Sequence, residues 1–305
     1  MNSMSTSKQA RLLSLTELNG VGDKRALKLV DLMGGIDAVF QASPHELSEF
    51  HFIDEATYES LQNLEPTIQD YEQRISDAES ENVELLTPLD KFYPDRLRKC
   101  HTPIQLFVRG NQELLQMECV SFAGSRDAND AAIQWTKRIA TEVADRNYCV
   151  VSGGAFGVDR AAHEAAIDVD GDTIIVSPSG HNNPYPGANS DLFKKVEQRG
   201  LIVSHRFPDQ EPARGGFIYR NKTNSALGSR VVIAAAEIDS GSMSQYEVAT
   251  DQNRPVYVPN ESTNARPYNG LSKMVAEGSA SLIEKTEEMF ADSSSNLGQR
   301  RLDDW

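Results

Sequence analysis

Cysteine and long apolar runs are scarce in this sequence of 305 residues. Cys100, Cys119 and Cys149 are too few and too widely spaced for a disulfide framework or a zinc site, so we expect buried thiols. No run of about eighteen uncharged apolar residues occurs, so we expect no membrane span. The opening residues, MNSMSTSKQA, have no apolar segment like that of a secretory signal, which favours a cytoplasmic protein.

Basic residues are in the minority, with 30 Lys and Arg against 45 Asp and Glu and a net charge of −15. Spread evenly, this balance would argue against a nucleic-acid binder. The charge is uneven, however. Residues 46–84 hold twelve acids and one base, and residues 284–305 hold six acids and three bases, whereas residues 194–230 hold eight bases and three acids. This local excess of +5 fits either a solvated face or a phosphate-binding surface.

The six histidines show no metal-ligand spacing, apart from Asp159 and His163, which lie four residues apart on an expected helix. Such a pair could take part in acid-base chemistry or hold a metal. More often it is a carboxylate at a helix start with a hydrogen-bonded histidine. We therefore expect no metal, no other cofactor and no catalytic residue.

The sequence pattern changes along the chain, which predicts a small all-α domain followed by a larger α/β domain. Residues 1–86 repeat apolar positions at three- and four-residue spacing and read as a small helical domain of the helix-hairpin-helix or SAM-like kind. Residues 87–285 are expected to form the α/β domain, and residues 286–305 a flexible tail.

The sequence LNGVGDKRALKLV places Gly20 and Gly22 between two helical patterns and resembles the helix-hairpin-helix motif. The glycine turn of that motif offers backbone N–H groups to a phosphate, with Lys24 and Arg25 beside it here. An ordinary helix-helix turn has the same glycines. Gly20, Gly22 and Lys24 are candidates for a secondary DNA contact, with the plain turn as the alternative.

From Cys119 onward, short apolar segments alternate with helical patterns, which predicts a doubly wound, mostly parallel, Rossmann-like sheet. The expected strands are 119–124, 148–154, 173–180, 201–207, 231–237 and 255–260. The expected helices between them are 131–146, 160–167, 191–199, a segment around 218–227, and 243–252.

Glycine and serine follow three of these strands, at the edge where ligands bind in open parallel sheets. The candidate residues are Gly124, Ser125 and Arg126 after the first, Ser152 to Gly157 after the second, and Ser240, Gly241 and Ser242 after the fifth. Small residues let backbone N–H groups approach an anion. The glycine spacing does not match a dinucleotide fingerprint, the Walker A lysine is missing, and Ser152 lies outside any Gly-x-Ser-x-Gly motif.

The order of motifs resembles the DNA-processing protein A (DprA/Smf) family. The matching sequences include YPDRLRKCHTPIQLFVRGN, AGSR, VVSGGAFGVDRAAHEAA, IIVSPSGHNNPYP, LIVSHRF, GGFIYRNKTNSALGSRVVIAAAE and NGLSKMVAEGSASLI, from Tyr93 to Ile283. The resemblance implies a single-stranded DNA-binding protein that is not an enzyme. It would protect incoming or exposed strands, form a homodimer and help load a RecA-type recombinase in DNA uptake (competence and natural transformation) and recombination.

The resemblance also assigns roles to residues. Arg126 would contact phosphate, and Phe217, at a loop position, would stack on a base. The remaining expected DNA contacts are backbone donors at Ser152, Gly153, Gly154, Phe156 and Gly157, a pocket wall at Arg220 and Asn221, and basic residues Arg214 and Lys222.

The chain departs from the family pattern at several positions. Phe156 stands where the family usually has arginine, His205-Arg206 where it has a glutamate, and Lys222 where it has a second arginine. Two other functions stay open. One is a nucleotide-cleaving hydrolase of the lysine decarboxylase-like group, for which Glu247 is the candidate acid, and the other is a sensor of a nucleotide signal.

Overall fold

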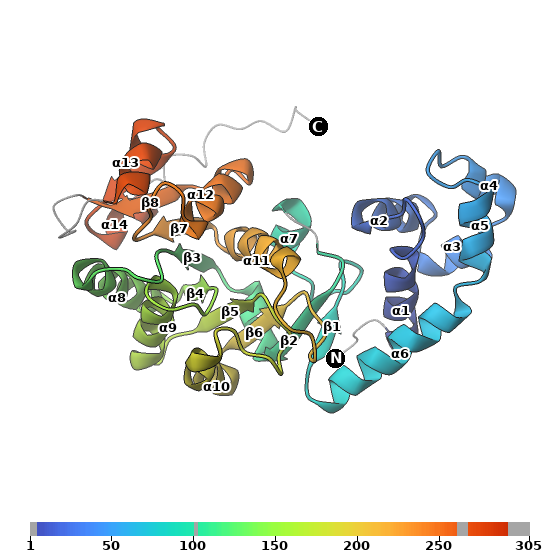
Figure 1. Cartoon of the computed structure of the whole chain (residues 1–305), viewed down its shortest axis with the longest axis horizontal. Coiled ribbons are helices and arrows are strands. Elements are labelled where there is room, and N and C mark those ends of the chain that lie inside the picture. Colours follow the sequence, from blue (N-terminus) through green and yellow to red (C-terminus); the bar gives the residue numbers. More distant parts are fainter. Residues whose placement is uncertain (1–4, 101–102, 261–267, 292–305) are drawn as a thin grey trace.

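Helices form the N-terminal part of the chain, and a sheet with helices on both faces forms the rest (Figure 1). The structure is a computed structural model that describes residues 5–100, 103–260 and 268–291. The N-terminal helices are α1 (Thr6–Leu15), α2 (Asp23–Leu32), α3 (Ile36–Gln41), α4 (Pro44–Ser48), α5 (Glu55–Gln62) and α6 (Glu65–Ser80). We refer to these six helices as the helical module.

Local sequence explains where several of these helices begin. Ser43 and Glu46 form a reciprocal capping box at the start of α4. Asp54 caps α5 by accepting a hydrogen bond of 2.8 Å from the backbone N–H of Thr57. The periodic leucines, such as Leu12 in α1, turn inward and form one buried cluster.

The described residues contain a nine-stranded sheet in the order β1-β2-β6-β5-β4-β3-β7-β8-β9. Strands β3 to β9 run parallel, and β1 and β2 add an antiparallel edge. The six expected strands are confirmed as β3 (Cys119–Ala123), β4 (Cys149–Ser152), β5 (Thr173–Ser177), β6 (Leu201–Ser204), β7 (Arg230–Ile233) and β8 (Val256–Pro259). The sequence reading missed β1 (Glu84–Leu86), β2 (Leu106–Gly110) and β9 (Ala280–Ile283).

Helices cover both faces of the sheet, as a doubly wound fold requires (Figure 1). On one face α9 packs between α8 and α10, and on the other α11 packs between α7 and α12. Their bounds are α7 (Asp95–Cys100), α8 (Asp130–Ala144), α9 (Val158–Asp168), α10 (Ser190–Arg199), α11 (Arg214–Leu227), α12 (Gly241–Asp251), α13 (Asn269–Ala276) and α14 (Thr286–Ala291), with short 3-10 helices at Gln112–Gln116 and Gly187–Asn189.

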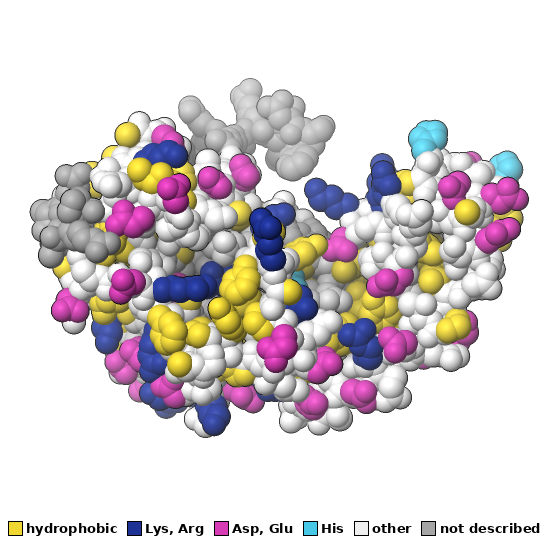
Figure 2. Space-filling model, viewed as in Figure 1, with side chains coloured by type: hydrophobic (Ala, Val, Ile, Leu, Met, Phe, Trp, Pro, Cys, Tyr) yellow, Lys and Arg dark blue, Asp and Glu magenta, His cyan; other side chains and the backbone are white. Residues whose placement is uncertain are grey.

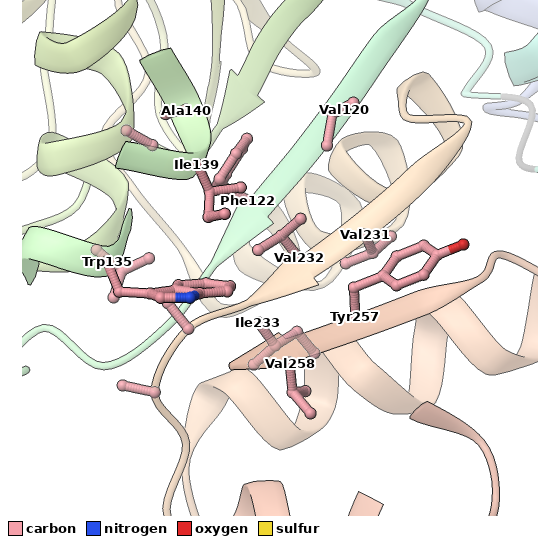
Figure 3. Close-up of a cluster of buried hydrophobic side chains, with 14 of the residues drawn as sticks. Val120, Phe122, Trp135, Ile139, Ala140, Val231, Val232, Ile233, Tyr257 and Val258 are labelled. Carbon is pink, nitrogen blue, oxygen red and sulfur yellow. The ribbon is translucent and has the colours of Figure 1, made fainter. Parts of the chain in front are cut away.

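The main core lies between the central strands and α8. Figure 3 shows Phe122 of β3 and Val232 of β7 in the same cluster as Trp135 and Ile139 of α8. All four side chains are buried, as are the thiols of Cys119 and Cys149, whereas Cys100 is half-buried. The continuously apolar strands therefore pack on both faces, which is why they were recognisable in the sequence.

The helical module packs on the antiparallel edge. Gln9 donates a hydrogen bond of 2.8 Å to the Leu85 carbonyl in β1. Phe207, just after β6, contacts Tyr71 and Arg74 of α6, with the Arg74 guanidinium 3.7 Å from its ring centroid. A cation over an aromatic face is attractive, so this contact helps hold α6 on the sheet.

The expected tail, 286–305, begins as helix rather than as flexible chain. Residues 286–291 form α14, and its Met289 is fully buried, because this turn packs on the main core. Residues 292–305 lie outside the described part. Within the described ranges, no helix has both the length and the apolar character needed to cross a membrane.

Candidate nucleic-acid interface

The carboxyl edge of the sheet has a switch point at β3. From β3 the chain continues to β4 on one side, while β7 pairs with β3 on the other. In open α/β sheets ligands bind where the strand order reverses in this way. The loops after β3 and β7 meet there, since the Ser125 N–H donates a hydrogen bond of 2.8 Å to the Ala235 carbonyl.

The loops after β3 and β4 are in direct contact, and their glycines make this contact feasible. A Cβ on Gly124 would overlap the side chain of Val158, and a Cβ on Gly157 would overlap the carbonyl oxygen of Ser125. Gly157 also has a φ of +68°, which a side chain rarely tolerates. The Val158 N–H donates to the Ser125 carbonyl at 3.3 Å. Two of the three expected loops thus form one surface.

Arg220 lies across the end of β4 and closes the glycine turn. Its Nη2 is 2.6 Å from Oδ2 of Asp159, and the two side chains are 16% and 5% exposed. A Cβ on Gly153 would overlap the guanidinium, so this glycine provides the space that Arg220 occupies. The ion pair joins the start of α9 to α11 across the sheet edge.

This arrangement corrects the expected role of part of the second loop. Ser152, Gly153 and Gly154 are buried, because the Arg220 guanidinium and the Phe193 ring cover the turn. The Ser152 hydroxyl donates to the Phe122 carbonyl at 2.9 Å, so it is not directed at a ligand. Only Phe156 and Gly157 reach the surface from this loop, Phe156 being 41% exposed.

Arg126 and Arg214 supply exposed positive charge at this edge. Arg126 lies in the turn after β3, and Arg214 is the first residue of α11. Neither makes an ion pair with any residue in the described ranges. Both guanidinium groups are therefore available to an anion, unlike that of Arg220.

Phe217 belongs to an aromatic pair. The expected loop position is wrong, since α11 begins at Arg214 and Phe217 lies in its first turn. Its ring meets the Tyr185 ring edge-on, with centroids 5.4 Å apart. Phe217 is only partly buried and remains accessible for a base to stack on. The sequence reading missed Tyr185, which follows β5 between two prolines and gave no signal of its own.

The third expected loop is only partly open. Gly241 is exposed and Ser240 half-buried, whereas Ser242 is buried because α12 packs on α11. Asn221 is also engaged in the structure: its Oδ1 accepts from Arg220 at 3.0 Å, and its carbonyl accepts from Gln245. Ser242 and Asn221 therefore pack beneath the edge, whereas Ser240 and Gly241 lie nearer its surface.

Asp159 and His163 do not pair with each other but with different partners. Asp159 binds Arg220, and Nδ1 of His163 lies 2.7 Å from the Thr173 hydroxyl. That hydroxyl donates to the Val150 carbonyl, so the histidine must be the donor in its bond to Thr173. Burial lowers the pKa of His163 to about 4. The geometry therefore favours a structural histidine over an acid-base catalyst.

The groups exposed at this edge suit the binding of an anion. Among the described residues, no group of three or more His, Cys, Asp and Glu side chains is arranged to hold a metal ion. Glu247, the acid required by the hydrolase alternative, is exposed on α12. Asp159 and His163, the acid-base pair that the sequence suggested beside the glycine turn, have the structural partners described above. The edge thus offers cations, backbone and aromatic surface to a ligand.

Lys222 lies away from this edge, in a cleft between α11 and the helical module. The cleft has a volume of about 980 Å³, and Gly20, Gly22 and Lys24 line its opposite wall. Figure 2 shows Lys and Arg side chains gathered where α2, α7 and α11 approach one another, and acidic side chains over the outer helices of the module. Gly20 has a φ of +75°, and its carbonyl accepts from Arg25 at 2.6 Å, which closes the hairpin turn.

These features define a doubly wound α/β protein with a cationic, partly aromatic ligand surface at the switch point of its sheet. Comparison with known families gives the class a name. Residues 84–294 match the family model of DNA recombination-mediator protein A, and the chain belongs to that family.

Related proteins agree with this assignment. The chain is 27% identical over 293 residues to Protein Smf of Synechocystis, which covers 93% of this chain and 72% of that protein. Its fold is similar to the X-ray structure of DprA from Streptococcus pneumoniae, with a TM-score of 0.74 and 24% identity. That match covers 95% of this chain and 99% of the Streptococcus chain. The fold is also similar to a structure of DNA processing protein A from Helicobacter pylori that is described for its single-stranded DNA binding mode. The TM-score is 0.62 and the identity 29%, and the match covers 70% of this chain and 96% of that chain.

Proposed function

We propose that this protein binds single-stranded DNA at the carboxyl edge of its sheet. The observation that carries the proposal is the exposed guanidinium of Arg126 at the switch point, which forms no ion pair within the described ranges, on the same sheet edge as the accessible rings of Phe156 and Phe217. Cations that follow the backbone and rings that stack on bases together give binding that tolerates any sequence. The single-stranded DNA binding described for the Helicobacter pylori relative supports this choice of ligand.

We further propose that the bound strand is protected and passed to a RecA-type recombinase, and that the protein acts as a homodimer in the cytoplasm without itself being an enzyme. These finer points rest on family membership. A strand that comes from DNA uptake would place the protein in competence, and a strand exposed during repair would place it in general recombination. Loading is testable by the rate at which a recombinase covers a strand coated with single-strand binding protein, with and without this protein.

Replacing Arg126 by alanine should weaken single-strand binding roughly tenfold, because it removes a charge-assisted contact to phosphate. The slope of log affinity against log salt should become shallower by about 0.7. Fluorescence anisotropy with a labelled oligonucleotide measures both. Arg199→Ala is the matched control, since Arg199 lies at the opposite edge of the sheet and pairs with Asp170.

Three results would redirect the proposal. Unchanged affinity in the Arg126→Ala variant would remove the switch point from the binding site. Double-stranded DNA competing as well as single-stranded DNA would overturn the strand preference. Mononucleotide that binds more tightly than the oligonucleotide, or is cleaved, would support the sensor or the hydrolase in place of DNA binding.

Phe217→Ala should lower affinity by about 1–3 kcal/mol, the value of one base stacked on an aromatic ring. Phe217→Trp should keep most of the affinity, because any large ring offers the same surface. The same titration reports both variants, with the fluorescence of a base analogue such as 2-aminopurine as a direct probe of stacking. Equal loss in the two variants would indicate that Phe217 supports Tyr185 by packing and does not stack on DNA.

A further inference from the structure

The cleft between the helical module and α11 is strongly basic in an otherwise acidic protein. Five lining residues are cationic: Lys24 and Arg25 of α2, Arg98 and Lys99 of α7, and Lys222 of α11. Of the lining residues that the structure describes, two, Asp23 and Asp251, are acidic. The cleft therefore carries a formal charge of +3 within a chain of −15, and its cations come from elements far apart in the sequence.

The two arginines and the three lysines have different partners. Arg98 pairs with Asp95 and donates to the carbonyls of Pro88 and Tyr93, and Arg25 donates to the Gly20 carbonyl, so both shape the walls. The lysines are exposed. Within the described residues none of the three forms an ion pair. Three ammonium groups around one cleft repel one another until an anion enters it.

The shape and position of the cleft favour a polymer over a small anion. Its volume of about 980 Å³ is larger than a single phosphate needs, and it contains an aromatic surface in Tyr219, which is 39% exposed. Helix α11 connects it to the sheet edge. Arg214 and Phe217 in the first turn of α11 belong to the edge, and Lys222 lies in the cleft, about 12 Å along the helix axis from Arg214.

We propose that the cleft binds a second segment of the same single strand, so that the DNA runs along α11 from the switch point to the helical hairpin. This inference rests on the proposed function of the sheet edge. Lys24, Lys99 and Lys222 contact the phosphates, and Tyr219 offers a second stacking surface. The helical module thereby extends the length of strand that one protein molecule covers.

The test is a double variant, Lys24→Ala/Lys99→Ala, titrated against labelled oligo-dT of increasing length, from about 6 to roughly 30 nucleotides. The loss of affinity should grow with length and reach several-fold for the longest strands. For those strands the salt slope should become shallower by about 1.4, or 0.7 for each phosphate that a lysine no longer neutralises. Lys137→Ala/Lys273→Ala removes the same charge elsewhere, from lysines that pair with Glu164 and Glu277, and should change little.

Failure of this inference differs from failure of the proposed function. If the wild type binds and Arg126→Ala weakens binding, but the cleft variant matches the wild type at every length, the second segment does not exist. If the cleft variant and the control lose affinity equally, the cleft supplies only general charge. If the wild type binds none of the strands, the sheet-edge proposal itself falls. Circular dichroism verifies that each variant is folded.

Discussion

Gly153→Ala should reduce the free energy of unfolding by about 3 kcal/mol, a large effect for one added methyl group. The methyl would occupy the space of the Arg220 guanidinium, which can move only by leaving Asp159. The Asp159 side chain is 5% exposed, and an uncompensated buried carboxylate is costly. Urea denaturation followed by circular dichroism measures the change.

Gly215→Ala is the matched control, because no atom lies within 4 Å of a Cβ at Gly215 in the first turn of the same α11. It should be neutral or stabilising by up to about 1 kcal/mol, since alanine favours the helix and restricts the unfolded chain. The mechanism is tested by adding Gly153→Ala to Arg220→Met. If the added methyl destabilises the protein by displacing Arg220, Gly153→Ala should lower the free energy of unfolding little when Arg220 is already methionine. Full additivity would point to a backbone effect instead.

The central strands could be predicted because burial on both faces makes them continuously apolar. Strand β2 was missed because its apolar core, LFV, is short and is followed by Arg109 and Gly110 in a segment rich in charge. Strand β9 has two adjacent exposed residues, which point to opposite faces, since it is the edge strand and has a neighbouring strand on only one side. Edge strands carry less of the apolar pattern than central ones, so periodicity alone does not reveal them.

The candidate site shows the same limit at the level of single residues. Glycines mark where the backbone must approach something closely, but not what it approaches. Gly153 accommodates an arginine side chain from 67 residues further along the chain, and Gly216 lets α11 pass the carbonyl of Pro178. Phe217 was expected in a loop just before a helix around residues 218–227, but it lies inside α11. Such contacts depend on the folded arrangement, which local sequence does not encode.

Acidification from pH 7 to pH 5 should lower the free energy of unfolding by about 4 kcal/mol through two buried histidines. Burial lowers the pKa of both His163 and His181 to about 4. In the unfolded chain each would titrate near 6.5, so below that pH the unfolded state takes up protons that the folded state does not. Stability from these groups is therefore complete above pH 6.5 and declines as the pH falls towards 4, by about 2 kcal/mol for each histidine at pH 5.

His163→Gln should reduce that difference between pH 7 and pH 5 to about 2 kcal/mol, whatever it does to stability at pH 7. Urea titrations at both pH values, read from Trp135 fluorescence in a Trp305→Phe background, report unfolding of the sheet, because Trp135 packs on β3. His51→Gln, at an exposed position in the helical module, is the control and should leave the difference unchanged. An undiminished difference in His163→Gln would mean that His163 takes up its proton in the folded state as readily as in the unfolded state. Its buried Nε2 has no hydrogen-bond partner among the described residues, so the added charge would then need an anion nearby.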